Sequence, residues 1–464
     1  MGLFIDRERE LEVLEQAYRS PRPELVIVYG RRRVGKTYLV KRFLRGKEGI
    51  YLVVQYADRD LCLRDLSKQV SEYVGASLSF EWLRDLLIFV VRWLGSRCSR
   101  PLVVIDEFQR LVGTGLLAEL QSLWDSYSLG NAMLILLGSG VGVVQKLVLS
   151  YESPLYGRAT HVLRLEPFGY REARIFMKKW SAEDRVRGYA VFGGTPAYLA
   201  LIDDNLGLLE NIEKLVLSPG ARLLEEPLNL VSVETREPDR YLAILEAIAC
   251  GAHRPFEIAS RTGIAMDSLR KYLRVLEQGL ALVVRSYPLG MELKPRYVRY
   301  EIADNFFHFW FAEIYPRRRM IELGMHREVL SKIARNLDNY AARVWERIAF
   351  EHMALLSRVG KVRATSMGRW WWRGTEIDLV VLDEDSSTTY FVECVWGCAT
   401  RRDLINLIEK ARAFPWRKGS RKEIFVIYAK EVDGLEEREN EVLVYTLDRV
   451  EKDFDAYTPR IETI

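Results

Sequence analysis

The sequence has few of the features that mark secreted, membrane-spanning or zinc-stabilised proteins. Its 464 residues include only five cysteines, which are scattered and odd in number, as is typical of a reducing cell interior. Cys394 and Cys398 lie close together, but no second cysteine pair or neighbouring histidine completes a set of zinc ligands. No apolar run approaches the roughly 18 residues of a membrane span. These absences predict a cytoplasmic, soluble protein without a membrane partner.

Charge and the N-terminal segment exclude further classes. The net charge of +4 is small for this length, so any contact with nucleic acid must come from local basic patches. The stretch MGLFIDRERE is too charged for a signal peptide, and Asp6 stands where a myristoylation signal needs Ser or Thr. With 49% hydrophobic residues the chain can bury large cores. Its length suggests roughly three domains.

The first strong motif is the stretch LVIVYGRRRVGKTYLVKRFL. An apolar run of strand length leads into a turn that matches G-x-x-x-x-G-K-T from Gly30 to Thr37, and a helical pattern follows. Gly30 and Gly35 let backbone N–H groups surround an anion at the helix N-terminus. Lys36 would reach the β- and γ-phosphates, and the Thr37 hydroxyl would bind Mg²⁺. The pattern predicts a phosphate loop that binds a nucleotide.

A second apolar run, PLVVIDEFQRL, ends in two acids at the carboxyl end of a predicted strand, where parallel sheets place their chemistry. Asp106 would hold Mg²⁺ through water, and Glu107 would act as general base on the attacking water. A helix N-terminus that favours acids is the alternative explanation. The phosphate loop upstream favours the interpretation that Asp106 and Glu107 take part in hydrolysis.

Three more positions follow the acids. The strand AMLILLGSG brings Ser139 to its end, where the hydroxyl can bond to the attacking water or the γ-phosphate. ESPLYGRAT presents Arg158 after a glycine. This arginine either senses phosphate, in its own chain or a neighbouring subunit, or is a surface loop residue. VFGGTPAYLA places Pro196 at a bend between helices, which by pattern alone is a turn.

The middle of the chain predicts a lid and a winged helix-turn-helix. A helical pattern runs from Phe168 to about Thr235. RYLAILEAIACG, PFEIASRTGI and AMDSLRKYLRVLEQGL are then amphipathic, and ALVVRSYPLG and RYVRYEIAD are extended. Three helices and a hairpin in this order are typical of a winged helix. The expected DNA contacts are Ser268, Arg270, Lys271, Arg274 and Arg296. The alternative is a module of the nucleotide switch or a surface that binds a protein.

The tail from about Leu337 carries acids where a metal-dependent nuclease displays them. Glu346 lies on a predicted helix, Asp378 in the strand TEIDLVVL, and Glu393 in the strand TYFVECVW. Such carboxylates would hold a second divalent metal against a scissile phosphate. The stretch RWWWR before them either stacks on unpaired bases or forms a strand that buries its aromatic side chains.

One residue of that nuclease pattern is missing. Val395 stands two positions after Glu393, where such an enzyme needs a lysine to activate water. The nearest lysine C-terminal to Glu393 is Lys410, about three helical turns beyond the strand, which we expect to be too far to point back. A degenerate, nucleic-acid-binding or structural domain is therefore expected, with a slow nuclease as the alternative.

Together these motifs resemble a known family. FIDRERELEVL, YGRRRVGKT, LVVIDEF, LILLGS, SPLYGR and GGTPAYL look like the ordered motifs of the archaeal ATPases of the AAA+/STAND P-loop superfamily. The resemblance implies that Arg7 and Pro196 border the adenine and that the nucleotide is ATP. The tail resembles the restriction-endonuclease-like (PD-(D/E)xK) core, and the resemblance implies Glu-Cys-Lys-Trp where this chain reads Glu-Cys-Val-Trp.

The sequence therefore predicts an α/β chain in five parts. These are a parallel-sheet ATPase core over residues 1–167, a helical lid over 168–235, a winged helix over 236–303, a linker over 304–336 and a degenerate nuclease-like domain over 337–464. The predicted function is an ATPase that uses ATP and Mg²⁺, couples nucleotide state to the winged helix and tail, and acts on DNA. Two alternatives stay open: a signalling-type switch that binds protein partners or itself, and an active ATP-dependent DNA endonuclease of a mobile element or defence system.

Overall fold

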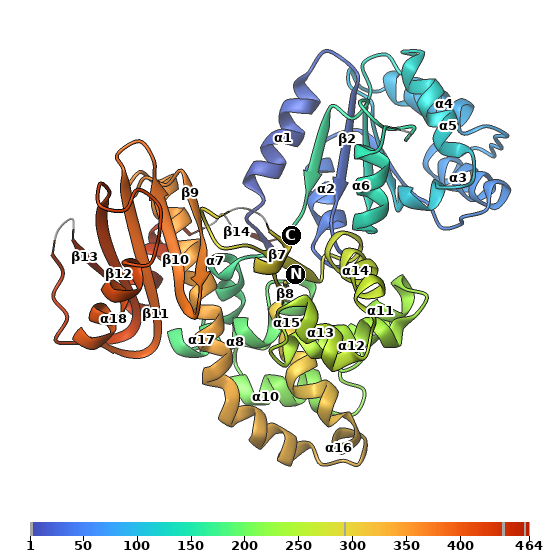
Figure 1. Cartoon of the computed structure of the whole chain (residues 1–464). Helices are drawn as coiled ribbons and strands as arrows, with labels where there is room; N and C mark the ends of the chain where they lie inside the picture. The colour runs from blue at the N-terminus through green and yellow to red at the C-terminus, as the bar shows by residue number, and fades with distance from the viewer. Residues whose placement is uncertain (1–2, 152, 292–293, 439–440, 459–460, 464) are drawn as a thin grey trace. The chain divides into compact units, whose positions relative to one another are not determined.

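The protein is described by a computed structural model that covers residues 3–151, 153–291, 294–438, 441–458 and 461–463 (Figure 1). The chain divides into two compact units. The first consists of Met1–Pro167, Gln278–Ala281 and Arg460–Ile464, and the second of Phe168–Glu277 and Leu282–Pro459. Among the described residues, no helix combines the length and the apolar character that crossing a bilayer requires.

The first unit is built on a parallel sheet in the strand order β3-β4-β5-β2-β6. Its strands are β2 (Glu24–Tyr29), β3 (Gly49–Val53), β4 (Leu102–Asp106), β5 (Met133–Gly138) and β6 (His161–Arg164). β2, β4 and β5 are buried along their whole length, which explains why their sequences are apolar except for Glu24 and Asp106 at strand ends. The predicted α/β class and parallel-sheet core are confirmed.

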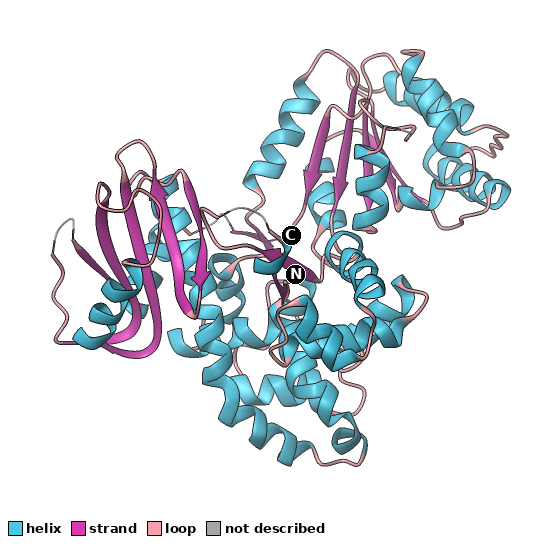
Figure 2. Cartoon of the chain, viewed as in Figure 1, coloured by secondary structure: helices cyan, strands magenta, loops and turns pink. Residues whose placement is uncertain are grey.

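Helices cover both faces of this sheet (Figure 2). α1 (Glu8–Arg19) and α2 (Lys36–Leu44) share one core with Val26 and Val28 of β2. Leu25 and Ile27, which alternate with them, enter a second core. The helices of that second core are α3 (Arg59–Val74), α4 (Leu83–Gly95), α5 (Leu116–Asp125) and α6 (Val141–Leu149). This layering leaves the carboxyl ends of the strands at one edge.

A two-stranded antiparallel pair completes the first unit. β1 (Leu3–Ile5) pairs with β14 (Ile461–Thr463), so the first and last described strands of the chain lie side by side. The sequence analysis predicts neither strand, because runs of three residues carry too little pattern to be recognised.

The second unit begins with short helices and continues into a hairpin. α7 (Tyr170–Ala173), α8 (Ala182–Phe192), α9 (Pro196–Leu199), α10 (Leu208–Ile212) and α11 (Glu226–Glu234) come first. α12 (Pro238–Ala249), α13 (Pro255–Thr262) and α14 (Met266–Arg274) follow. The antiparallel strands β7 (Val283–Ser286) and β8 (Arg299–Ile302) come next.

Residues 304–336, which the sequence predicts to be a linker, are largely helical. They form α15 (Asn305–Phe309), α16 (Arg318–Glu322) and the start of α17 (His326–Arg358), a helix of 33 residues. The reason is the aromatic run after Asp304: Phe306, Phe309 and Trp310 have no exposed surface and form part of a core.

The tail is a mixed sheet in the order β13-β12-β11-β10-β9. β9 (Ser366–Trp372), β10 (Thr375–Asp383) and β11 (Thr388–Thr400) are antiparallel neighbours, whereas β12 (Lys422–Asp433) and β13 (Val442–Thr446) continue in parallel. α17 and α19 (Leu447–Ala456) share a core with one face, and α18 (Arg401–Ala411) with the other. Trp370 and Trp371 of β9 are buried.

Candidate functional site

The turn from Gly30 to Thr37 joins β2 to α2 at the carboxyl edge of the first sheet. A side chain at Gly30 would place its Cβ 2.3 Å from the carbonyl oxygen of Leu165, so only glycine fits there. Gly35, which caps α2, has φ +96° in the left-handed region, where other residues are strained. Both glycines of the motif are therefore required by the backbone path that exposes the helix N-terminus.

Lys36 is folded over this turn. Its side chain is 7% exposed, and its Nζ donates to the carbonyl oxygens of Gly30 at 2.9 Å and Arg31 at 2.8 Å. Burial lowers the pKa of Lys36 to about 8, and the charges of Glu107 and Asp106 partly offset that effect. A lysine ammonium, a glycine turn and two acids are thus gathered at one place.

Asp106, at the end of β4, is held by three donors. Thr37 Oγ1 donates to its Oδ2 at 3.2 Å, and the Tyr51 hydroxyl of β3 donates to the same oxygen. The backbone N–H of Glu107 donates to Oδ1 at 2.8 Å. Tyr51 was missed by the sequence analysis, since a tyrosine within an apolar strand gives no sign of which neighbour it will face.

Glu107 and Ser139 are also brought together. Ser139 Oγ, at the end of β5, donates to Glu107 Oε2 at 3.0 Å. Gln109 Nε2 donates to the same carboxylate oxygen at 2.6 Å and to Ser139 Oγ at 3.1 Å. Gln109, in the motif DEFQ, is the second residue that sequence reasoning missed. Its signal was its spacing, two residues beyond the acid.

The donors at this edge fit Mg²⁺ and a phosphate chain. Hydroxyl and carboxylate oxygens are the ligands that Mg²⁺ prefers, and few protein ligands suffice where phosphates and water complete the shell. Thr37 and Asp106 would hold the ion, which neutralises charge between the β- and γ-phosphates. Lys36 would bind phosphate oxygens, and Glu107 could accept the proton of the attacking water.

The remaining residues predicted to touch nucleotide have other partners in the structure. Arg7 is 9% exposed, and its guanidinium donates to the carbonyl oxygen of Glu166 at 2.6 Å. Arg158 makes a bidentate pair with Asp125 of α5, at 2.7 and 2.8 Å. Pro196 is the first residue of α9 and belongs to the second unit. Their predicted roles at the adenine and at phosphate stay predictions.

The predicted DNA residues are exposed. On α14, Leu269 and Leu273 are buried, and the polar positions lie on the opposite, solvent-facing side. The Arg270 side chain is 72% exposed, and its contact with Asp267 is a loose 3.4 Å. The exposed residues of the predicted contact set are Ser268, Arg270, Lys271, Arg274 and Arg296.

The tail acids do not form the predicted metal site. Glu346 is paired with Arg369 at 3.2 Å, and Asp378 Oδ2 accepts the Cys394 N–H at 2.8 Å. Glu393 Oε1 lies 2.5 Å from Lys410 Nζ. Within the described ranges, no group of three or more His, Cys, Asp or Glu residues could hold a metal ion. A second divalent metal is therefore not supported, because internal cations already neutralise Glu346 and Glu393.

The expectation that Lys410 lies too far from Glu393 is wrong. α18 starts directly after β11 and packs against its face, with Leu407 and Ala411 buried in the shared core. The helix therefore returns along the strand and carries its third turn back to Glu393. Distance along the chain was a poor guide because helix and strand run beside each other.

Burial raises the pKa values of two acids in the tail. The pKa of Glu393 rises to about 7 through burial and the nearby Asp378, against the opposing effect of Lys410. Burial also raises the pKa of Glu346 to about 7, although Arg369 lowers it in part. These acids therefore change charge close to neutral pH.

The hairpin strand β8 is tied to the tail sheet by a set of ion pairs that we call the β8 clasp. Arg299 of β8 contacts Glu376 of β10 at 2.8 Å, and Glu301 of β8 contacts Arg369 of β9 at 2.9 Å. Arg369 also contacts Glu376 at 2.9 Å. Each pair between β8 and the tail sheet joins side chains of opposite charge, so the ion pairs link the hairpin to the tail.

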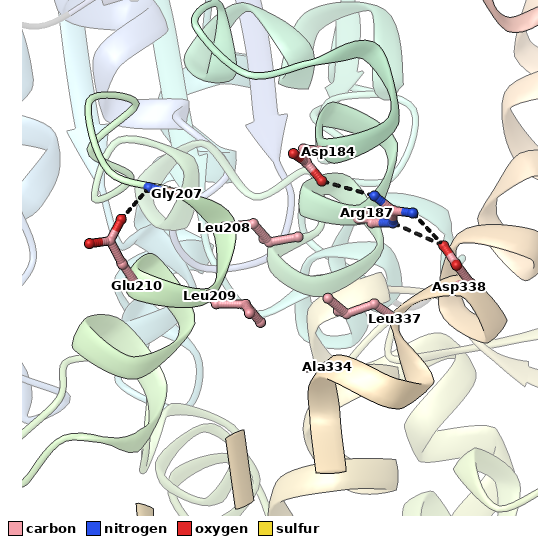
Figure 3. Close-up of a pocket in the computed structure, with 9 residues that line it drawn as sticks. All are labelled: Asp184, Arg187, Gly207, Leu208, Leu209, Glu210, Ala334, Leu337 and Asp338. Carbon is pink, nitrogen blue, oxygen red and sulfur yellow. Dashed lines mark hydrogen bonds and ion pairs between the residues drawn. The ribbon is translucent and has the colours of Figure 1, made fainter. Parts of the chain in front are cut away.

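A cavity of about 420 Å³ lies in the second unit, among α8, α10 and α17 (Figure 3). Leu208, Leu209 and Leu337 supply apolar lining, and Arg187 bridges Asp184 at 3.0 Å and Asp338 at 2.8 Å. None of the residues lining it belongs to the predicted sites. Arg187 is also paired with Glu183 at 3.1 Å, so three acids offset its charge.

The arrangement at the edge of the first sheet is that of a P-loop ATPase. Residues 4–202 match a family described as an ATPase domain predominantly from Archaea. Residues 310–406 match a family described as archaeal and bacterial proteins of unknown function. The Walker-type ATPase PABY2304 of Pyrococcus abyssi shares the fold, with a TM-score of 0.51 and 23% identity over 66% of this chain and 96% of that one.

Two proteins of Methanocaldococcus jannaschii are similar in sequence. The uncharacterized protein MJECL04 is 32% identical over 412 residues, which cover 87% of this chain and 89% of that protein. The uncharacterized ATP-binding protein MJ0423 is 50% identical over 46 residues, which are 10% of this chain and 78% of that protein. The chain belongs to the family of MJECL04, and its residues 4–202 match the archaeal ATPase domain. The predicted ATPase class is confirmed at this general level, and the ATPase family implies the use of ATP and Mg²⁺.

Proposed function

We propose that the protein is a DNA-associated ATPase in which the nucleotide state changes how the hairpin segment and the tail engage DNA. The observation that carries the proposal is the exposed polar and basic face of α14, opposite its buried leucines. In a winged helix this third helix enters the major groove, and basic side chains beside it contact phosphates.

The hairpin limits which arginines can contribute to that surface. Arg299 is held by Glu376, and Arg285 is paired with Glu277 at 3.2 Å. Arg296 is exposed, and its guanidinium lies 4.7 Å from the ring centre of Tyr297. The proposed footprint therefore consists of α14 and Arg296, and β8 serves to hold the tail.

The test measures duplex DNA binding by fluorescence anisotropy over a range of salt, with ATP turnover recorded with and without DNA. Arg270→Glu combined with Lys271→Glu should weaken binding. Because each phosphate contact releases counterions, losing two should flatten the salt slope by about 2. Lys332→Glu with Arg335→Glu makes the same charge change at exposed positions of α17 and serves as control.

The outcome separates this function from the signalling-type alternative. A drop in affinity confined to the α14 variant, with turnover that responds to DNA, supports the proposal. Wild-type affinity and salt slope in the α14 variant would instead favour a switch whose appended segments bind a protein partner or a second copy of the chain.

A second candidate is DNA cleavage by the tail. It is favoured by the Lys410 ammonium, which lies 2.5 Å from Glu393 although Val395 occupies the usual lysine position. A lysine can align or deprotonate a nucleophilic water, which a valine cannot. As arranged, however, the acids do not fit a divalent metal, so we derive no metal-dependent step.

Cleavage of supercoiled DNA in Mg²⁺ and in Mn²⁺ tests this candidate. Cutting by the wild type that is lost in both Asp378→Ala and Lys410→Ala would establish a nuclease with a relocated lysine. Intact DNA with the wild type, and no cutting after Val395→Lys, would reduce the tail to a scaffold. We expect little or no cleavage by the wild type.

A further inference from the structure

We propose that Gln109 is a positioning residue for ATP hydrolysis, which acts by holding the carboxylate of Glu107. The inference concerns the ATPase reaction itself and does not depend on whether the protein acts on DNA. It rests on the contacts among Gln109, Glu107 and Ser139 at the carboxyl edge of the first sheet.

Glu107 needs such a restraint because of where the chain places it. It is the first residue after β4, in a left-handed conformation with φ +57°, and it precedes a short 3₁₀ helix over Phe108–Leu111. Its side chain is 28% exposed. A glutamate on such a corner has several rotamers open to it unless neighbours select one.

Two donors converge on one oxygen of that carboxylate. Gln109 Nε2 lies 2.6 Å and Ser139 Oγ 3.0 Å from Glu107 Oε2, and Gln109 Nε2 is also 3.1 Å from Ser139 Oγ. The three side chains form a closed triangle. With Oε2 occupied by donors, the carboxylate is oriented through Oε2, and Oε1 is the oxygen available to accept a proton from water.

The orientation of the Gln109 amide is set by its surroundings. A flipped amide would place its carbonyl oxygen against the Glu107 carboxylate, where two acceptors repel. In the observed orientation the Gln109 Oε1 atom is buried without a hydrogen-bond partner, among the described atoms. That atom also lies at the end of β5, where a Cβ on Gly138 would come within 3.2 Å of it. Because the Gln109 carbonyl group makes no hydrogen bond within the described part of the chain, the contribution of this side chain to the site comes from its N–H group.

Arg110 is a charged donor near this carboxylate, but it does not fix the orientation of the carboxylate. Its Nε is 3.9 Å from Glu107 Oε2, and its Nη1 donates at 2.6 Å to the carbonyl oxygen of Gln55. At that separation it adds charge without fixing the geometry. Arg110→Gln therefore provides a nearby control with a small expected effect.

The experiment is steady-state ATP hydrolysis by the full chain. Gln109→Met keeps the length of the side chain and removes the donor, so kcat should fall about tenfold to a hundredfold with KM and ATP affinity unchanged. Gln109→Glu should be as slow near neutral pH, because two carboxylates face each other. It should recover part of its rate as the pH falls and the new side chain, once protonated, can donate again.

A second comparison separates positioning from general damage to the fold. If Gln109 acts through Glu107, then Gln109→Met should cause no further loss of rate in the Glu107→Gln background. The proposal is overturned if Gln109→Met alone hydrolyses ATP at the wild-type rate. It is also overturned if its loss is fully retained on top of Glu107→Gln, or if it arises from a raised KM.

Discussion

The ammonium nitrogen of Lys410 lies 2.5 Å from the carboxylate of Glu393, although 17 residues separate them in the chain. The pair forms because α18 folds back along β11. The helix thus provides a cation beside Glu393, whereas β11 itself has Val395 at the usual lysine position. Glu346 has its own cation in Arg369. Two of the acids expected to bind metal are therefore neutralised by the protein itself.

Mutations of the phosphate loop and of the general base should have different effects on ATP binding and on ATP hydrolysis. Lys36→Ala should abolish ATP binding, because it removes the cation that meets the phosphates. Glu107→Gln should bind ATP with unchanged affinity and hydrolyse it only at a small residual rate, because only the proton acceptor is lost. Binding of a fluorescent ATP analogue and phosphate release measure the two effects. Normal turnover by Glu107→Gln would show that another group is the base.

The affinity for ATP should fall as the pH rises above about 8, the pKa to which burial lowers Lys36. Below that pH the lysine is charged and attracts phosphate, and above it the neutral amine does not. In the unfolded chain lysine titrates near about 10.4, so between the two values the unfolded state binds more protons and stability rises with pH. Titration of ATP affinity from pH 7 to 10 checks the prediction. Lys36→Arg, which keeps its charge, should give a flat profile.

Removing the Tyr51 hydroxyl should raise the Mg²⁺ concentration that ATP turnover requires. Tyr51→Phe deletes one of the donors that orient Asp106 Oδ2. A hydrogen bond to a charged group contributes about 1.5–3 kcal/mol, so the Mg²⁺ concentration for half-maximal turnover should rise roughly tenfold. The maximal rate at saturating Mg²⁺ should stay the same. Tyr127→Phe, at a side chain 80% exposed, is the control. An unchanged Mg²⁺ requirement would contradict the assigned role.

The β8 clasp should show energetic coupling between strands. Arg299→Gln and Glu376→Gln, alone and together, form a double-mutant cycle in urea unfolding followed by tryptophan fluorescence. Because both side chains are mostly shielded from solvent, at 19% and 35% exposed, we expect a coupling energy of about 1 kcal/mol. Arg318 and Glu322 of α16 are only loosely paired at 3.8 Å, and Glu322 is 64% exposed, so this pair should give less than about 0.5 kcal/mol. Equal coupling in the two pairs would mean that the clasp does not hold the hairpin to the tail.

The sequence by itself determined, to a large extent, which residues gather at the carboxyl edge of the first sheet. The phosphate-loop motif, the acids after β4 and the serine after β5 all follow runs of apolar residues, and parallel strands place their carboxyl ends at a common edge. Local rules were sufficient there because each of these residues lies at the end of a strand or in the turn and helix start that follow a strand. The segment 304–336, predicted as a linker, begins with an aromatic run after Asp304 that lies in a core, because dense apolar segments are buried away from water.

Only the tertiary structure decided the contacts between segments far apart in the chain. Tyr51 meets Asp106 because β3 and β4 are neighbours, and Lys410 meets Glu393 because α18 returns along β11. The β8 clasp likewise joins a hairpin to a sheet much further along the chain, since Arg299 and Glu376 are 77 positions apart. Periodicity and motif spacing specify which side of an element is buried, but the partner of a charged side chain depends on which elements pack together. Which elements pack together depends on the core as a whole and cannot be read from any single stretch of sequence.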